Sequence, residues 1–175
     1  MLEELTSSQK SIWVTEQYYK GTSINNICGT SIIEEKVKFD KLEEAIEIVC
    51  NKHDNFKLCL KIDTNGDVKQ EKKDLKDEKI EIINIVDKKQ LEKEREKIVK
   101  EPLCFENKLL FKFYIFKFED GKGAFMLNIH HLIADAWTLA FICNEIIKTY
   151  SQLINNKEIE TKPIYSYIDH INDEQ

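Results

Sequence analysis

Two adjacent histidines, followed by an aspartate four positions after the second, are the residues of this sequence best suited to chemistry. His130, His131 and Asp135 lie in the segment NIHHLIADAW, residues 128–137. A neutral imidazole can accept a proton near pH 7, and a carboxylate can orient a neighbouring group. Two histidines are costly in an apolar segment, because each buried ring nitrogen needs a hydrogen-bond partner. The pair therefore needs an explanation beyond packing.

The two histidines are predicted to face opposite sides of a strand, because successive side chains alternate between the faces of a sheet. One imidazole can then reach a cavity while the other packs or forms hydrogen bonds inside the fold. Taken alone, such a pair is more often structural than catalytic. His130 and His131 point apart and the sequence has no second cluster of ligands, so we predict no metal site. Asp135 is positioned to cap the following helix or to pair with a cation.

The elements that must hold these residues are two strands and a helix. Residues 109–118 predict a long strand rich in aromatic residues, EDGKG a turn, and residues 123–131 a core strand that runs back. The following segment is predicted to be helical because its apolar residues recur at helical spacing: Leu139, Ile142, Ile146, Tyr150 and Leu153. Rigid elements of this kind hold a reactive group beside a cleft.

The rest of the chain mixes helices and strands without a regular βαβ rhythm, which favours an α+β layered domain. The polar stretch 63–101 is expected at an edge of the fold. Asp40 and Glu43 resemble a capping box at the start of a helix. The predicted elements are a helix over 7–19, strands over 25–35 and 56–62, a helix from Asp40 to 54, a turn at 64–67 and a return strand after it, a strand near 80–86, a charged helix over 88–101 and a short helix near 166–173.

Composition limits the function classes. The chain has 175 residues, 42% hydrophobic, and a formal net charge of −6, which fits one core and argues against general attraction to nucleic acid. No CxxC motif occurs among the five scattered cysteines, so a reducing, cytoplasmic location is expected. No apolar run approaches membrane-spanning length, and we expect no membrane association. The cysteines are Cys28, Cys50, Cys59, Cys104 and Cys143.

Four segments, in order, resemble the motifs of one family. HHLIADA, residues 130–136, resembles the HHxxxDG signature of the condensation domains of nonribosomal peptide synthetases, within the chloramphenicol-acetyltransferase-like superfamily of acyltransferases. LTSSQKSIWV (5–14) is similar to the SxAQxRLW element, KHDNFKLCL (52–60) to RHExLRTxF and SYIDH (166–170) to YxDY. Gln9, Trp13 and His53 match, and Asp54 stands at a glutamate position. Four ordered matches are far more specific than HHxxxD alone.

The sequence departs from the family pattern at two site positions. Ala136 replaces the signature glycine, which would strain the backbone if that position needs positive φ. Lys57 stands where the family has an arginine that pairs with the signature aspartate. Lysine keeps the charge and loses the bidentate fork, so the resemblance implies a looser Lys57–Asp135 pair.

The resemblance implies a fold, a reaction and partners. The fold is an α/β sandwich lobe with a mixed or mostly antiparallel sheet, in which residues 1–175 form the N-terminal lobe and the C-terminal lobe is absent. The reaction is amide formation between an acyl or peptidyl thioester and an aminoacyl acceptor, both carried on the phosphopantetheine arms of upstream and downstream carrier proteins, with no cofactor bound directly. His131 is implied as the catalytic residue, His130 as structural and Asp135 as an organiser of the loop. A stand-alone HHxxxD acyltransferase, an epimerization domain and a non-enzymatic lobe that docks carrier proteins remain alternatives.

Overall fold

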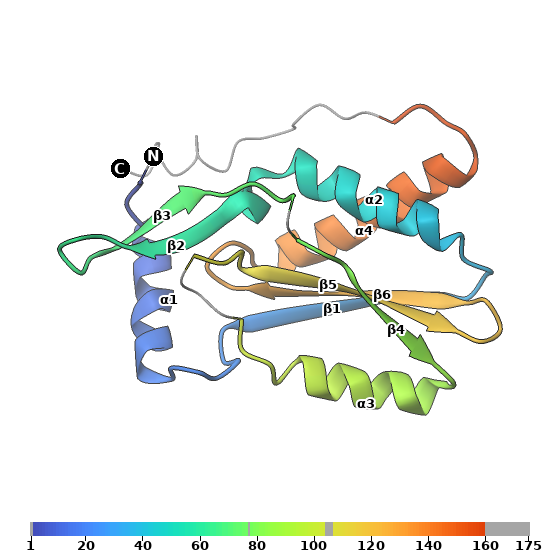
Figure 1. Cartoon of the computed structure of the whole chain (residues 1–175), viewed down its shortest axis with the longest axis horizontal. Coiled ribbons are helices and arrows are strands. Elements are labelled where there is room, and N and C mark those ends of the chain that lie inside the picture. Colours follow the sequence, from blue (N-terminus) through green and yellow to red (C-terminus); the bar gives the residue numbers. More distant parts are fainter. Residues whose placement is uncertain (1, 77, 104–106, 160–175) are drawn as a thin grey trace.

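A four-stranded mixed sheet is the centre of the molecule (Figure 1). The computed structural model describes residues 2–76, 78–103 and 107–159. The sheet has the order β1-β6-β5-β4, formed by β1 (Asn26–Ile33), β6 (Gly123–His130), β5 (Phe111–Phe118) and β4 (Glu81–Ile85). β6 pairs antiparallel with both β1 and β5, and β4 pairs parallel with β5. The predicted α+β class with a mixed sheet is therefore confirmed.

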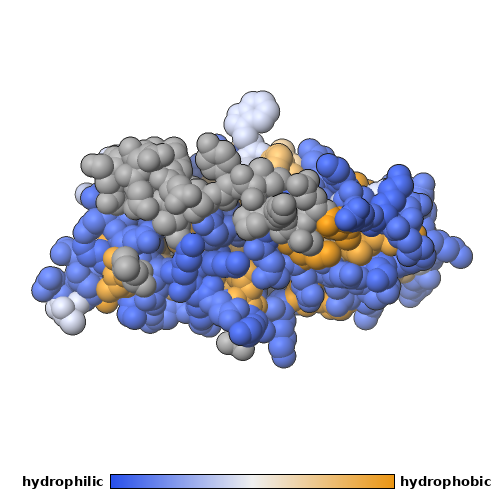
Figure 2. Space-filling view, turned by 90° about the horizontal axis from the view of Figure 1, so that it is seen from above, coloured by the Kyte–Doolittle hydropathy of each residue, from blue (hydrophilic) through white to orange (hydrophobic). Residues whose placement is uncertain are grey.

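Helices cover both faces of this sheet. α2 (Phe39–Lys52) and α4 (Ala136–Ile154) lie on one face, and α3 (Lys88–Ile98) lies on the other (Figure 1). The side chains of β5 and β6 alternate accordingly: Phe113, Ile115, Phe125 and Leu127 join the large core under α2 and α4, while Tyr114, Phe116 and Met126 pack with Leu91 and Ile98 of α3. All eight residues of β6 are buried. Among the residues coloured in the view from above, most of those at the surface are hydrophilic, with smaller apolar patches between them (Figure 2).

α1 and a hairpin lie together at the end of the sheet where β6 finishes (Figure 1). α1 (Ser7–Tyr18) begins after Thr6, which forms a capping box with Gln9. The hairpin consists of β2 (Leu58–Ile62) and β3 (Val68–Lys72), preceded by a short 3-10 helix η1 (Asp54–Lys57). Backbone hydrogen bonds between Glu3 and Gln70 attach the N-terminal segment to β3. This end of the fold therefore brings together residues that are far apart in the sequence.

Several boundaries differ from the sequence prediction. α2 begins at Phe39, its N-cap Lys38 makes no side-chain capping bond, and Asp40 lies in the first turn, where its charge favours the helix dipole. The predicted capping box at Asp40 is therefore wrong. The strand predicted from residue 56 begins at Leu58, because residues 54–57 form η1 and bury Phe56 in the core.

Two further expectations concern the periphery. The polar stretch 63–101 lies at an edge only in part: β4 is an outer strand of the sheet, whereas α3 packs on one of its faces. The expected helix near 166–173 and the SYIDH segment lie outside the described residues. In the part of the chain that the structure describes, none of the helices is both long and apolar enough to cross a membrane.

Candidate active site

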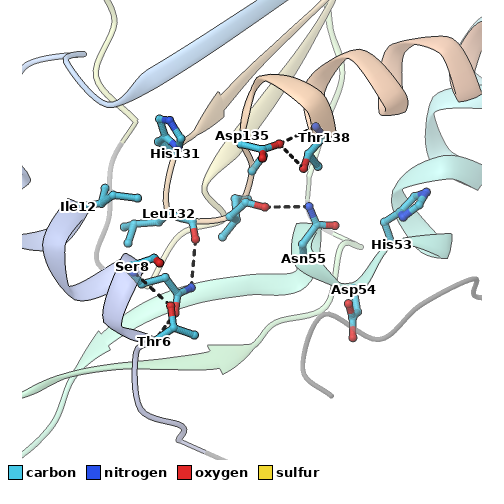
Figure 3. Close-up of a pocket in the computed structure, with 13 residues that line it drawn as sticks. Thr6, Ser8, Ile12, His53, Asp54, Asn55, His131, Leu132, Asp135 and Thr138 are labelled. Atoms are coloured by element: carbon cyan, nitrogen blue, oxygen red, sulfur yellow. Dashed lines mark hydrogen bonds between the residues drawn. The ribbon is translucent and has the colours of Figure 1, made fainter. Parts of the chain in front are cut away.

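A cavity of about 500 Å³ lies where β6 ends and the chain turns into α4 (Figure 3). Its walls come from α1, η1 and the turn between β6 and α4. The lining residues are Thr6, Ser8, Gln9, Ile12, His53, Asp54, Asn55, His131, Leu132, Ile133, Ala134, Asp135 and Thr138. Three segments that resemble family motifs in the sequence thus surround one cavity.

Two buried amide side chains hold the backbone of the turn 131–135. Gln9 Nε2 donates to the carbonyl oxygen of Leu132 at 3.1 Å, and Asn55 Nδ2 donates to the carbonyl oxygen of Ile133 at 3.0 Å (Figure 3). Gln9 is itself fixed by its capping box with Thr6 and by hydrogen bonds to Gln70 at 3.1 and 3.2 Å. Because an amide has a directional donor and acceptor, these contacts fix the path of the turn more tightly than apolar packing would.

His130 is fully buried on the inner side of β6. Its Nδ1 accepts from the backbone N–H of Leu132 at 3.1 Å, and its Nε2 lies 3.3 Å from Glu16 Oε2. A neutral ring that accepts at Nδ1 carries its proton on Nε2, which then donates to the Glu16 carboxyl group. Burial lowers the pKa of His130 to about 4 even though the hydrogen bond to Glu16 acts in the opposite direction. The first histidine is therefore a neutral part of the scaffold near pH 7.

His131 has the opposite environment. Its side chain is exposed and lines the cavity, and its backbone N–H donates to the carbonyl oxygen of Asn25 at 2.8 Å (Figure 3). The two imidazoles have different environments, as expected: one is buried in hydrogen bonds and the other lines the cavity, although β6 ends at His130 and His131 lies in the turn that follows it. A neutral imidazole placed there can accept a proton from a bound molecule or donate a hydrogen bond to it.

Asp135 is the N-cap of α4. Its Oδ1 accepts from the backbone N–H and from the hydroxyl group of Thr138, both at 2.7 Å (Figure 3). These hydrogen bonds lower the pKa of the Asp135 carboxyl group. Asp135 thus joins the histidine turn to the first turn of the helix.

The Lys57–Asp135 pair expected from the resemblance is wrong. Lys57 Nζ donates to the carbonyl oxygen of Asn51 at 3.2 Å, and the ion pairs formed between described residues do not join it to Asp135. The physical reason is that each group has a closer partner: the Asp135 carboxylate lies at the N-terminus of α4, and the Lys57 ammonium lies near the last carbonyls of α2.

Ala136 occupies the position of the signature glycine without backbone strain. It is the first residue of α4 and is not one of the residues with positive φ. A helical position accepts alanine better than glycine. The conformational objection to Ala136 therefore does not apply in this chain.

A second cluster of polar side chains surrounds His53, which also lines the cavity. Glu145 of α4 contacts Lys52 Nζ through Oε1 and His53 Nε2 through Oε2, both at 2.5 Å. Burial opposes ionisation of Glu145, but these two partners lower its pKa overall. The Phe141 ring packs edge-on against the His53 ring, with centroids 5.9 Å apart. Two residues of α4 therefore hold His53 at the cavity.

Sequence reasoning missed four residues of this site: Glu16, Asn55, Thr138 and Glu145. Glu16 had a detectable signal, since Gln9, Trp13 and Glu16 recur at helical spacing on one face of α1. A charged residue on a face that must be buried indicates a partner inside the fold.

Among the described residues, no group of three or more His, Cys, Asp or Glu side chains is arranged to hold a metal ion.

Comparison with known proteins identifies one family model and several related synthetases. The family model described as "Condensation domain" matches residues 3–175. Surfactin synthase subunit 1 of Bacillus subtilis (strain 168) is 29% identical over 185 aligned residues, which cover 98% of this chain and 5% of that protein. Gramicidin S synthase 2 of Aneurinibacillus migulanus is 22% identical over 90% of this chain and 3% of its own length.

Solved condensation domains have the same fold. The starter condensation domain of the rhizomide synthetase RzmA superposes with a TM-score of 0.89 at 16% sequence identity, over 99% of this chain and 43% of that chain. The first condensation domain of the CDA synthetase gives a TM-score of 0.84 at 13% identity, over 99% of this chain and 45% of its own. This chain thus spans less than half the length of each solved domain. It belongs to the condensation-domain family.

Proposed function

We propose that this chain is the N-terminal lobe of a condensation domain that forms amide bonds on a nonribosomal peptide synthetase. The observation that carries the proposal is the difference in environment between the two histidines. His130 is buried in hydrogen bonds, whereas His131 reaches a cavity of about 500 Å³ from a turn that Gln9 and Asn55 hold in place. A preorganised turn that presents one imidazole to a cavity suits acyl transfer from an already activated thioester.

In this proposal the amine of an aminoacyl acceptor attacks the carbonyl carbon of the donor thioester. A carbon–nitrogen bond forms, the carbon–sulfur bond breaks, and the donor's carrier arm leaves as a thiol. His131 takes the proton that the attacking amine loses, or hydrogen-bonds the tetrahedral centre as its charge develops. Asp135 contributes by fixing the start of α4 beside the turn, and it does not exchange protons with the substrates.

The partners follow from this chemistry. The two thioesters arrive on the phosphopantetheine arms of an upstream and a downstream carrier protein, and this lobe binds no cofactor of its own. The chain spans 43% of the rhizomide starter domain. We infer that a second lobe supplies the other wall of the cavity and helps to orient both arms.

The test uses the intact protein with both lobes and two loaded carrier proteins. His131→Ala should lower the rate of amide formation by about 10²- to 10⁴-fold, the range that general acid–base catalysis supplies, without a change in thermal stability. Lys57→Ala is the matched control, since it alters the 52–60 segment at a side chain that contacts Asn51 and lies outside the cavity lining. It should keep full activity.

Two outcomes would contradict the proposal. A folded His131→Ala variant with normal amide formation would remove His131 from the reaction. Epimerised acceptor in place of a new amide, identified by chiral chromatography of the released products, would assign the site to proton abstraction at a carbon atom.

The 175-residue chain alone should give no condensation above background, because the second lobe that helps to orient both thioesters is missing.

A further inference from the structure

A buried carboxyl group on α1 lies behind the histidine pair. Glu16 is 2% exposed, and its Oε2 accepts from Asn25 Nδ2 at 2.7 Å and lies 3.3 Å from His130 Nε2. Its Oε1 is buried and has no hydrogen-bond partner among the described residues. Glu16 does not line the cavity, so it cannot touch a molecule bound beside His131.

We propose that Glu16 is a positioning residue that fixes His131 from both sides of its backbone. This inference rests on the proposed function of His131 and adds to it the residue that holds the imidazole in place. Glu16 acts through two contacts, one with His130 and one with Asn25. It takes no part in proton transfer to the substrates.

The first route runs through the tautomer of His130. The Glu16 carboxyl group accepts the Nε2 proton, which leaves the Nδ1 lone pair free for the backbone N–H of Leu132 at 3.1 Å. If the ring adopted the other tautomer, Nδ1–H and Leu132 N–H would both be donors and would repel each other. Glu16 therefore selects the tautomer that anchors the residue directly after His131.

The second route runs through the segment before β1. Glu16 holds the side chain of Asn25, and the carbonyl oxygen of Asn25 accepts from the backbone N–H of His131 at 2.8 Å. The same carboxyl group thus fixes the acceptor for His131 and the anchor for Leu132. Two contacts that converge on neighbouring residues restrict the peptide between them more than either contact alone.

The burial of Glu16 supports a role beyond packing. Moving a carboxyl group out of water is unfavourable, and an apolar side chain of similar size would fill the same space without that cost. A carboxyl oxygen offers what an apolar residue cannot, namely two lone-pair directions on one atom that serve Asn25 and His130 together.

The first experiment needs only this chain, labelled with ¹⁵N at histidine. Long-range ¹⁵N–¹H NMR spectra report the tautomer of each ring, and we expect His130 to carry its proton on Nε2 throughout pH 6–8. A proton on Nδ1 in the unmodified chain would overturn the proposal. Glu16→Leu should release the ring into a mixture of tautomers, whereas Glu16→Gln, which keeps an acceptor oxygen, should retain the Nε2 form. Glu145→Gln is the control for removing a carboxylate elsewhere in the site and should leave the His130 signals unchanged.

A second variant tests the contact between Glu16 and Asn25 even if Glu16→Leu does not fold. Asn25→Ala removes the side-chain contact with Glu16 and leaves the carbonyl oxygen that His131 uses. Amide hydrogen exchange at His131 should become at least about tenfold faster in this variant, while exchange in the middle of β5 stays the same. Unchanged exchange at His131 would refute the second route.

Activity in the intact two-lobe protein separates positioning from folding. Glu16→Leu should lower kcat by about 10- to 100-fold with little change in KM, and Glu16→Gln should restore most of the loss. A folded Glu16→Leu variant with altered His130 tautomers and unchanged kcat would overturn the positioning role. If the intact protein formed no amide at all, the proposed function would fail, but the tautomer and exchange measurements would still decide whether Glu16 fixes the turn.

Discussion

Replacement of Asp135 by alanine tests whether this aspartate acts as a helix cap or as half of an ion pair. Both acceptor contacts of Asp135 go to Thr138 at 2.7 Å, and the side chain is exposed. Loss of an N-cap costs about 1 kcal/mol, within a range of about 0.5–2 kcal/mol. A buried ion pair broken at one partner would cost about 3–5 kcal/mol. The structure therefore predicts the smaller value for Asp135→Ala.

The assay is urea unfolding of this chain, followed by circular dichroism, with thermal unfolding as a second measure. A loss of about 1 kcal/mol corresponds to a fall in Tm of about 2–4 °C for a chain of this size. Asp135→Asn keeps an acceptor oxygen at the cap and should lose only about 0.3–1 kcal/mol, the contribution of a charge at a helix N-terminus. Lys57→Ala combined with Asp135→Ala should give the sum of the two single effects.

Two results would refute this reasoning. A loss of about 3 kcal/mol or more in Asp135→Ala would indicate a buried charge partner in place of a cap. A coupling energy above about 0.5 kcal/mol between Lys57 and Asp135 in the double-mutant cycle would restore the ion pair that the observed hydrogen bonds replace.

Three further predictions follow from contacts of the core and the site. Burial holds the pKa of His130 near 4, whereas the unfolded chain titrates near 6.5, so His130 contributes stability above pH 6.5 that is lost as the pH falls toward 4, a difference on the order of 3 kcal/mol. In His130→Gln, the free energy of urea unfolding should therefore depend less on pH between 4 and 6.5. The same pH dependence in the variant and the unmodified chain would contradict a buried, neutral His130. Asn55→Leu leaves the carbonyl oxygen of Ile133 unpaired and should lower the free energy of unfolding by about 1–3 kcal/mol in the same assay. An unchanged free energy of unfolding would show that this hydrogen bond does not hold the turn. Gly123→Ala places a methyl group 2.9 Å from Phe39 Cε1 and should destabilise the chain by about 1–3 kcal/mol, with partial recovery on adding Phe39→Leu; a stable single variant would show that the ring moves aside freely.

The elements around the site could be predicted from the sequence because their patterns are strong and local. Strands β5 and β6 follow from runs of aromatic and apolar residues, and the turn between them follows from its glycine-containing sequence EDGKG. The alternation of successive side chains along a strand predicts that His130 and His131 point in opposite directions. Both faces of β6 are buried, so the exposure of His131 has another cause: the strand ends at His130, and His131 lies in the turn that follows.

The polar contacts around the histidines were harder to predict, because they depend on which groups meet in three dimensions. The expected Lys57–Asp135 pair rested on an arginine, whose rigid fork favours a carboxylate. A lysine ammonium has no such geometric requirement, and in this chain it lies against the carbonyl oxygen of Asn51. Glu16 and Asn55 contact the histidine turn across more than 75 residues of sequence, a relation that local periodicity does not contain.

The pairing of β1 with β6 has a consequence for how the protein folds during synthesis. Asn26 pairs with His130, so about 100 residues must follow β1 out of the ribosome before its partner strand exists. At about 5–20 residues per second, that delay lasts roughly 5–20 seconds. β5 and β6 are joined by a short turn and can form a hairpin early, whereas β1 and the α1 residues behind the histidines have to wait for it. The histidine turn is therefore among the last parts of the lobe to assemble, and a ribosome that stalls before β6 would leave an unpaired β1 strand exposed to aggregation.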